Sequence, residues 1–198
     1  MQPFEYARPS TLSDVFDLFD DHGPEASLLA GGTDLIVALR NRTLKPKVVV
    51  DLKRVAELRS GIGESGTSLT INANTVLADL NDDQRIQARF PALVEAAAVV
   101  GSIQIRNRAT LTGNICHASP AADTAPALLV YGAVVNVASA TGSRRVHLNE
   151  FFVGPRETVL KPGELATSIE LPIPAEHGGA TFARITRRRG VDLATISL

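Results

Sequence analysis

The chain has 198 residues, the length of one large domain or two small ones. Hydrophobic residues make up 44% and charged residues 21%, which is typical of a globular protein and excludes a disordered one. The net charge of −1 excludes the basic surface of a protein that binds nucleic acid or an anionic membrane.

Cysteine content and apolar runs exclude further classes. The single cysteine cannot form an internal disulfide or supply an all-cysteine zinc or iron–sulfur site. The longest apolar runs, such as residues 125–130, are shorter than the ~20 residues that span a bilayer. The four histidines contain no i, i+4 pair, so no metal site is predicted. We therefore expect a cytoplasmic protein without a membrane span.

The first fifty residues alternate between strand and helix patterns. Three strands are predicted, at 4–7, 26–30 and 48–51. A helix begins after Ser10 or Thr11 and ends at Gly23-Pro24, and a second begins after Thr33 or Asp34. This order predicts a small α/β unit with a parallel sheet, which we place at residues 1–54.

The pattern changes after Asp51. Residues 58–63 and 68–72 flank a turn and predict a hairpin, and further strands are predicted at 133–138, 164–171 and 180–186. Helices are predicted at 75–80, 91–100 and 125–131. Strands joined by hairpins, with interspersed helices, predict an α+β unit with an antiparallel sheet, which we place at residues 55–176.

Ala30-Gly31-Gly32-Thr33-Asp34 follows a predicted strand and opens a helix. Glycines there would let the backbone approach a ligand closely, and the helix N-terminus favours an anionic phosphate. The alternative is an ordinary tight turn. Asp51 ends a strand where a ribose-binding acid would stand, but the G-x-G-x-x-G spacing is missing, which argues against a nicotinamide site.

A second candidate segment runs from Thr110 to Asn114 and continues to residues 119–124. Gly113 and Asn114 are expected to turn the chain with positive φ and to expose backbone amides. Asp123 could accept hydrogen bonds from sugar hydroxyls. The alternative is two capped loops, with Asp123 serving as the N-cap of the helix that follows.

Together, residues 30–34, 105–114 and 119–123 resemble the FAD-binding medium subunits of the molybdenum hydroxylases, which include carbon monoxide dehydrogenase medium chains and xanthine dehydrogenase flavin subunits. The resemblance runs from Phe4 to the last residue. It implies the α+β FAD-binding fold of the vanillyl-alcohol oxidase and molybdopterin dehydrogenase type, with FAD held between the two subdomains. It also implies that residues 177–198 are the truncated start of a third domain, which would leave Leu193, Ile196 and Leu198 exposed.

The family pattern, carried over position by position, also implies a set of cofactor contacts, with Arg184 taken as an exposed charge contact. These are Ala30, Gly31, Gly32, Thr33, Asp34 and Leu35 around the diphosphate; Thr110, Gly113 and Asn114, with His117 close behind, in a second phosphate-side loop; Asp123 at the sugar hydroxyls; Ala166 and Arg184 at the adenine and flavin; and Val100 and Gly101 at the pocket wall.

The sequence departs from the family pattern at two places. Thr33-Asp34 stands where the first loop often has His-Ser or Asn-Thr, and Thr112 stands where the second loop often has a glycine. Neither change removes a backbone donor, so FAD binding is still expected, although Thr112 narrows the space for close backbone approach.

The function implied by the resemblance is electron transfer. Electrons would reach FAD from a [2Fe–2S] subunit, which draws them from a molybdopterin-binding subunit, and would leave to NAD⁺, a quinone or oxygen. No residue of this chain is assigned a catalytic role, and no metal is expected in it. Two alternatives stay open: a flavin-free assembly module of such a complex, and a stand-alone FAD-dependent oxidoreductase.

Overall fold

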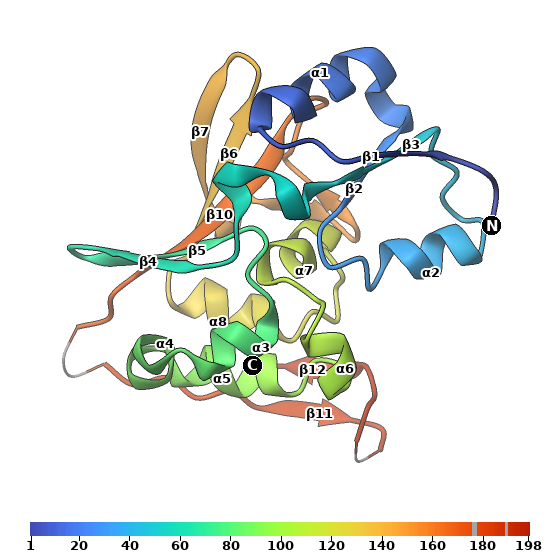
Figure 1. Ribbon diagram of the computed structural model, residues 1–198. Coiled ribbons are helices and arrows are strands. Elements are labelled where there is room, and N and C mark those ends of the chain that lie inside the picture. Colours follow the sequence, from blue (N-terminus) through green and yellow to red (C-terminus); the bar gives the residue numbers. More distant parts are fainter. Residues whose placement is uncertain (176–177, 189) are drawn as a thin grey trace.

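The N-terminal subdomain is built on a three-stranded parallel sheet. The computed structural model describes residues 1–175, 178–188 and 190–198. Strands β1 (Glu5–Ala7), β2 (Ala26–Leu29) and β3 (Val48–Asp51) lie in the order β1-β3-β2, and both pairs are parallel. Helices α1 (Leu12–His22) and α2 (Leu35–Arg40) connect them (Figure 1). The predicted α/β unit is confirmed.

Local capping fixes the ends of α1. Thr11 is its N-cap: the Thr11 hydroxyl accepts from the Asp14 N–H (3.2 Å), and the Asp14 carboxylate accepts from the Thr11 N–H (3.0 Å). This reciprocal pair is a capping box. The helix ends at Gly23, whose φ of +50° favours glycine.

Asp51 ends the central strand β3 and is almost fully buried. Its carboxylate accepts hydrogen bonds from the Tyr6 hydroxyl and from the Lys53 N–H (3.0 Å), and it pairs with the Lys53 ammonium (2.5 Å). The Asp51 carboxylate is therefore engaged by protein groups.

The second subdomain contains a five-stranded antiparallel sheet in the order β4-β5-β10-β6-β7. Its strands are β4 (Ile62–Ser65), β5 (Ser68–Asn72), β6 (Val134–Ser139), β7 (Gly142–His147) and β10 (Leu165–Pro172). Two short antiparallel pairs, β8 (Phe152–Gly154) with β9 (Glu157–Thr158) and β11 (Arg184–Thr186) with β12 (Ala194–Ser197), complete the strands. The predicted α+β class is confirmed.

Six helices of this subdomain lie between β5 and β6. They are α3 (Leu77–Asp82), α4 (Gln84–Arg89), α5 (Pro91–Ala98), α6 (Ile103–Arg106), α7 (Leu111–His117) and α8 (Thr124–Val130). The short helices α4 and α6 were not predicted. The expectation of positive φ at Gly113 and Asn114 was wrong, because both residues lie inside α7. The strand predicted at 180–186 is confined to β11.

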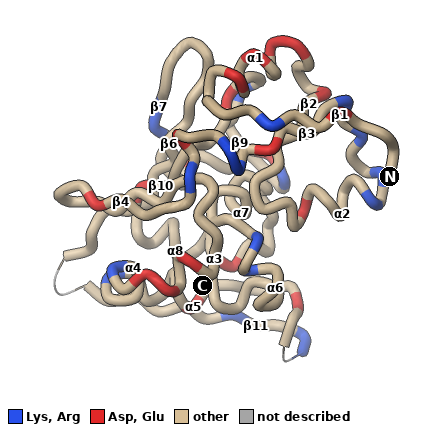
Figure 2. Tube along the Cα trace, viewed as in Figure 1, with Lys and Arg blue, Asp and Glu red and all other residues tan. Residues whose placement is uncertain are grey.

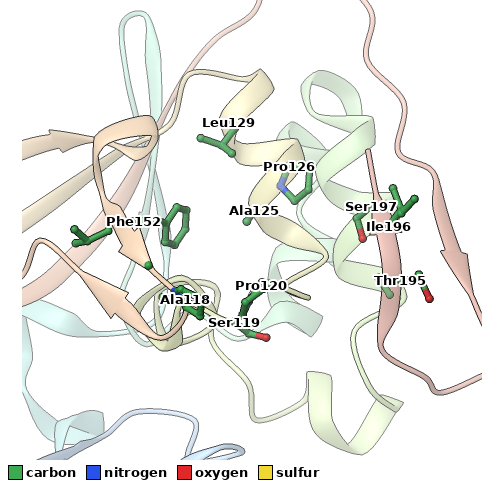
Figure 3. A pocket seen from close by; sticks show the side chains of 15 residues that line it. Ala118, Ser119, Pro120, Ala125, Pro126, Leu129, Phe152, Thr195, Ile196 and Ser197 are labelled. Carbon is green, nitrogen blue, oxygen red and sulfur yellow. The ribbon is translucent and has the colours of Figure 1, made fainter.

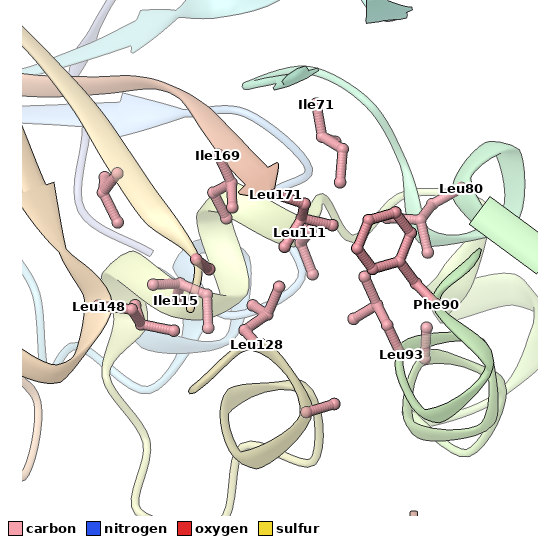
Figure 4. Packing of buried hydrophobic residues seen from close by; sticks show 14 of the residues in the cluster. Ile71, Leu80, Phe90, Leu93, Leu111, Ile115, Leu128, Leu148, Ile169 and Leu171 are labelled. Carbon is pink, nitrogen blue, oxygen red and sulfur yellow. The ribbon is translucent and has the colours of Figure 1, made fainter. Parts of the chain in front are cut away.

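Two hydrophobic clusters hold the chain together. The larger packs helices against one face of the five-stranded sheet and includes Phe90, Leu111, Leu128 and Ile169 (Figure 4). The smaller contains Val15 and Val50 of the N-terminal unit, but also residues beyond the boundary predicted at residue 54: Val55, Leu58, Ala73 and Leu165. The two subdomains therefore share buried packing. The other predicted boundary, at residues 176 and 177, lies outside the described residues.

The surface carries interspersed charges and a few exposed apolar side chains. Figure 2 shows acidic and basic residues distributed along the whole trace. Leu193, Ile196 and Leu198 are 68%, 52% and 74% exposed, as predicted. In the described ranges, no helix is both long enough and apolar enough to cross a membrane.

A partly buried ion pair beside the five-stranded sheet gives a first testable prediction. The Arg144 guanidinium donates to both carboxylate oxygens of Glu164 (2.8 Å each) and lowers the pKa of Glu164 from 4.5 to about 2. Because this pKa is depressed in the folded chain, the pair stabilises the fold above pH 4.5, and the stabilisation is lost as the pH falls towards 2. We expect Glu164→Gln to lower the free energy of unfolding by about 2 kcal/mol at neutral pH.

Urea unfolding at neutral pH and at a pH of about 3 measures this effect. The difference between Glu164→Gln and the parent should shrink at the lower pH. Glu150→Gln, a change at an exposed carboxylate on the same subdomain, is the matched control and should leave stability unchanged. A loss at Glu164 that does not depend on pH would contradict the assignment.

Candidate functional site

The two glycine-containing segments predicted from the sequence meet in the structure. A Cβ added to Gly31 would lie 2.1 Å from the carbonyl oxygen of Arg108 and 3.0 Å from Cα of Ala109. No side chain fits in that space, so glycine is required where the first segment touches the chain leading into the second. The prediction had explained this glycine by close approach to a ligand. In the structure the close approach is between two parts of the chain.

The first segment presents a run of unengaged donors. Within the described chain, no backbone N–H of residues 31–35 donates a hydrogen bond, while the carbonyls of Gly32 and Asp34 accept from Ile36 and Ala38 of α2. Gly32 has a φ of +79°, which curves the segment. Successive free N–H groups in a curved segment suit the oxygens of a phosphate. This donor set fits the diphosphate of FAD.

In the second segment, the backbone N–H groups of Gly113 and Asn114 donate to Thr110 of the same segment. Thr110 is the N-cap of α7: its hydroxyl accepts from the Gly113 N–H (3.0 Å), and its carbonyl accepts from the Asn114 N–H (3.0 Å). The side-chain oxygen of Asn114 accepts from the Thr124 hydroxyl (2.7 Å), which ties α7 to α8. The amides of Gly113 and Asn114 are therefore not exposed donors, which corrects the expectation from the sequence.

Asp34 and His117 face each other between the two segments. The distance between the Asp34 Oδ1 and the His117 Nε2 is 3.6 Å, and both side chains are partly exposed. Asp34 holds the N-cap position of α2, but its side chain makes no capping hydrogen bond. The Asp34–His117 contact thus joins the first segment to the C-terminal end of α7.

Asp123 and Arg184 form a second cluster. The Asp123 carboxylate accepts from the Arg184 guanidinium (3.0 Å) and from the Ser197 hydroxyl (3.1 Å), and the same guanidinium donates to the Val99 carbonyl (3.4 Å). The Asp123 and Arg184 side chains are only 8% and 15% exposed. Burial raises the pKa of Asp123, although Arg184 and Ser197 act in the opposite direction. Arg184 is therefore a buried partner of Asp123, and its interpretation as an exposed contact was wrong.

The remaining predicted residues lie on the elements around these clusters. Val100 packs against the larger hydrophobic cluster, and Gly101 turns the chain with a φ of +53° before α6. Ala166 is buried on β10, beside a bulge in its pairing with β6. Ala30 and Leu35 are half-buried at the two ends of the first segment. The structure thus brings most predicted positions towards two clusters, around Gly31 and around Asp123.

Thr112 is a buried polar residue without a partner. It is 4% exposed, and its hydroxyl has no hydrogen-bond partner among the described residues. A buried hydroxyl that lacks a partner costs about 1–3 kcal/mol. We expect Thr112→Val, which keeps the shape and removes the hydroxyl, to unfold at the same or a higher temperature than the parent. Calorimetry measures this, and a clear drop in the unfolding temperature would show that the hydroxyl is bonded.

One feature was missed from the sequence. A cavity of ≈ 610 Å³ lies beside residues 118–122, between α8, β8 and β12 (Figure 3). None of the predicted cofactor residues lines it. Its walls come from segments far apart in the chain, which a sequence pattern cannot connect. Only residues 119–122, next to Asp123, had been singled out from the sequence. Among residues 1–175, 178–188 and 190–198, no group of three or more potential metal ligands is present.

The fold is a small unit with a parallel sheet packed against a larger α+β unit with an antiparallel sheet, and, within the described residues, the backbone N–H groups of residues 31–35 are free where the two glycine-containing segments meet. The model of the FAD binding domain in molybdopterin dehydrogenase matches residues 2–174. The chain belongs to this family, and FAD is its cofactor.

Individual relatives agree with this assignment. The chain is 37% identical over 193 residues to the xanthine dehydrogenase FAD-binding subunit of Escherichia coli O157:H7, covering 96% of this chain and 65% of that protein. It is 35% identical over 192 residues to the carbon monoxide dehydrogenase medium chain of Hydrogenophaga pseudoflava, covering 97% and 66%. The chain therefore spans slightly less than two thirds of the length of these relatives.

Solved structures show the same fold. Carbon monoxide dehydrogenase from Hydrogenophaga pseudoflava superposes with a TM-score of 0.94 at 34% identity, covering 100% of this chain and 69% of that chain. Quinoline 2-oxidoreductase from Pseudomonas putida 86 superposes with a TM-score of 0.91 at 33% identity, covering 99% and 67%. The FAD-binding fold expected from the sequence is confirmed.

Proposed function

We propose that this chain is the FAD-binding, electron-transfer component of a molybdenum-containing hydroxylase. The observation that carries the proposal is the meeting of the two segments at Gly31, which places the free donors of residues 31–35 next to the chain leading into α7. A diphosphate held there would touch both segments at once.

Different residues of the chain would contact different parts of FAD. Backbone N–H groups of residues 31–35 would donate to the diphosphate, with the Thr33 hydroxyl as a further donor. Asp123 would accept from sugar hydroxyls while Arg184 keeps its charge balanced. The turn at Val100-Gly101 would form the wall beside the flavin. Bound FAD supplies the redox chemistry, and the protein supplies position and electrostatics.

The names of the relatives support a place in a multi-subunit complex. Proteins similar to this chain are named as a xanthine dehydrogenase FAD-binding subunit and a carbon monoxide dehydrogenase medium chain, and one solved relative is described as a Cu,Mo-CO dehydrogenase. We propose a [2Fe–2S] subunit as the electron donor, a molybdopterin-binding subunit as the source of electrons, and NAD⁺, a quinone or oxygen as the acceptor. The proposed location is the cytoplasm.

Purification followed by titration with FAD tests the proposal. We expect visible flavin absorbance that stays with the folded chain, and no turnover of small substrates in the absence of partner subunits. Reduction of the bound flavin by a reduced [2Fe–2S] subunit supports electron transfer. A folded chain that takes up no flavin would support a flavin-free assembly module instead. Turnover of a small substrate by the chain alone would support a stand-alone oxidoreductase.

A further inference from the structure

The cavity beside residues 118–122 has the size of a small-molecule site. Its volume of ≈ 610 Å³ falls within the range of roughly 300–1,000 Å³ found for ligand pockets. Figure 3 shows Phe152 on one side, Ile196 on the other, and Ala125 and Leu129 of α8 between them. The small side chain of Ala125 leaves the space open.

The lining is mostly apolar, with hydroxyls from Ser119, Thr195 and Ser197, and it carries no charged side chain. No Lys, Arg, Asp or Glu side chain contributes to it, and three prolines, Pro120, Pro126 and Pro155, form stiff parts of the wall. Phe152 offers a ring edge or face for stacking. Such a lining favours a neutral ring and offers no cation to hold a phosphate-bearing ligand.

The cavity also contains a hydroxyl that can donate. The Ser119 Oγ accepts from the Ala121 N–H (3.3 Å), so its own O–H remains to donate to a ligand oxygen. Ser197, on the opposite wall, donates to Asp123 instead. A ring carrying a carbonyl oxygen therefore matches the site better than a plain hydrocarbon.

The cavity adjoins the proposed cofactor site. Its wall at residues 118–122 connects His117 to Asp123, so the same short segment separates the cavity from both clusters. Its rim exposes large apolar side chains of α8 and β8: Leu129 and Val153 are 42% and 67% exposed. Exposed apolar side chains around a hollow are a common feature of ligand sites.

We propose that this cavity binds a neutral carbonyl-bearing ring compound of the quinone class. Binding itself does not depend on the proposed function. The role of such a ligand as electron acceptor rests on the proposed function. A quinone would then be the favoured acceptor over NAD⁺, because the lining has no cationic side chain to bind the phosphates of NAD⁺. The cavity is thus a second ligand site, separate from the residues assigned to FAD.

The test uses the purified full chain with menadione and a short-chain ubiquinone as probes and NAD⁺ as the comparison ligand. Dissociation constants are measured by calorimetry for the parent, Ala125→Phe and Val130→Phe. Ala125 lines the cavity, whereas Val130 lies on the same helix, is 71% exposed and does not line it. We expect the Phe at position 125 to weaken quinone binding at least about tenfold by filling the space, and the Phe at position 130 to leave it unchanged.

A second variant keeps the test decisive if Ala125→Phe folds poorly. Ser119→Ala should weaken quinone binding about fivefold, the effect of one lost hydrogen bond. The proposal is overturned if neither quinone binds the parent, if both variants bind like the parent, or if NAD⁺ competes at the cavity. Flavin absorbance is recorded in the same samples. A chain that binds FAD but no quinone contradicts the second site alone, and one that binds quinone but no FAD contradicts the proposed function alone.

Discussion

Replacing Arg184 by Ala is expected to lower the free energy of unfolding by about 3 kcal/mol, because it leaves the Asp123 carboxylate buried without its cation. The Asp123 side chain is 8% exposed, so water cannot replace the guanidinium without a rearrangement. The same change removes the bond from Arg184 to the Val99 carbonyl, which ties β11 to the turn before α6. We therefore expect the β11–β12 hairpin to loosen and FAD binding to weaken with it.

Urea unfolding at two pH values measures this prediction. Burial already raises the pKa of Asp123, and removal of Arg184 should raise it further. A raised folded-state pKa costs stability as the pH rises, so the loss should be larger at neutral pH than at a pH of about 4. Arg40→Ala is the control, because Arg40 is exposed on α2 and makes no ion pair within the described part of the chain; it should change stability little.

A double-mutant cycle measures how much the Asp123–Arg184 pair itself contributes to stability. Asp123→Asn combined with Arg184→Ala should cost less than the sum of the two single changes, because the buried charge is then gone. Additive losses, or an Arg184→Ala variant as stable as the parent, would show that the ion pair does not hold the hairpin.

The second large effect is expected at Gly31. A Cβ there would lie 2.1 Å from the Arg108 carbonyl oxygen, which is backbone and cannot swing aside. Gly31→Ala should therefore force the two segments apart, with a loss of about 2 kcal/mol in stability and at least about a tenfold loss in FAD affinity. Unfolding measurements and FAD titration of the same preparation report the two effects.

Gly63→Ala is the matched control, because a Cβ at Gly63 meets nothing within 4 Å. It should bind FAD like the parent. Gly32→Val, which also should lose FAD, is a weaker test. The Gly32 φ of +79° and the Leu29 side chain 2.6 Å from an added Cβ make that variant strained with or without a cofactor. Parent-like FAD affinity in Gly31→Ala would contradict the contact between the segments.

Local signals made the N-terminal subdomain predictable. Thr11 with Asp14 caps α1, Gly23 ends it, and continuous apolar runs mark the buried strands. The same kind of reasoning failed at residues 110–117. There Gly113 and Asn114 favoured a loop, but the cap at Thr110 and the buried Leu111 and Ile115 stabilise a helix instead. Tertiary packing overrode local propensity.

The candidate site could be predicted only in part, because it depends on contacts between residues far apart in the sequence. The sequence, with its family resemblance, identified both segments, but not that Gly31 touches the backbone of Arg108. It placed Asp123 and Arg184 at the cofactor separately, whereas the structure pairs them across 61 positions of sequence. The cavity joins three distant segments, 118–129, 152–155 and 194–197, for the same reason. Such pairings follow from topology and packing, which a single sequence does not reveal.

If the two segments form one FAD site, binding of FAD should depend on their contact at Gly31. Equilibrium dialysis of FAD against the purified, folded chain tests it most directly, with Gly63→Ala and Gly31→Ala measured alongside. We expect one FAD per chain for the parent and Gly63→Ala, and strongly reduced binding for Gly31→Ala. A folded parent chain that retains no FAD, or equal binding by all three proteins, would contradict it.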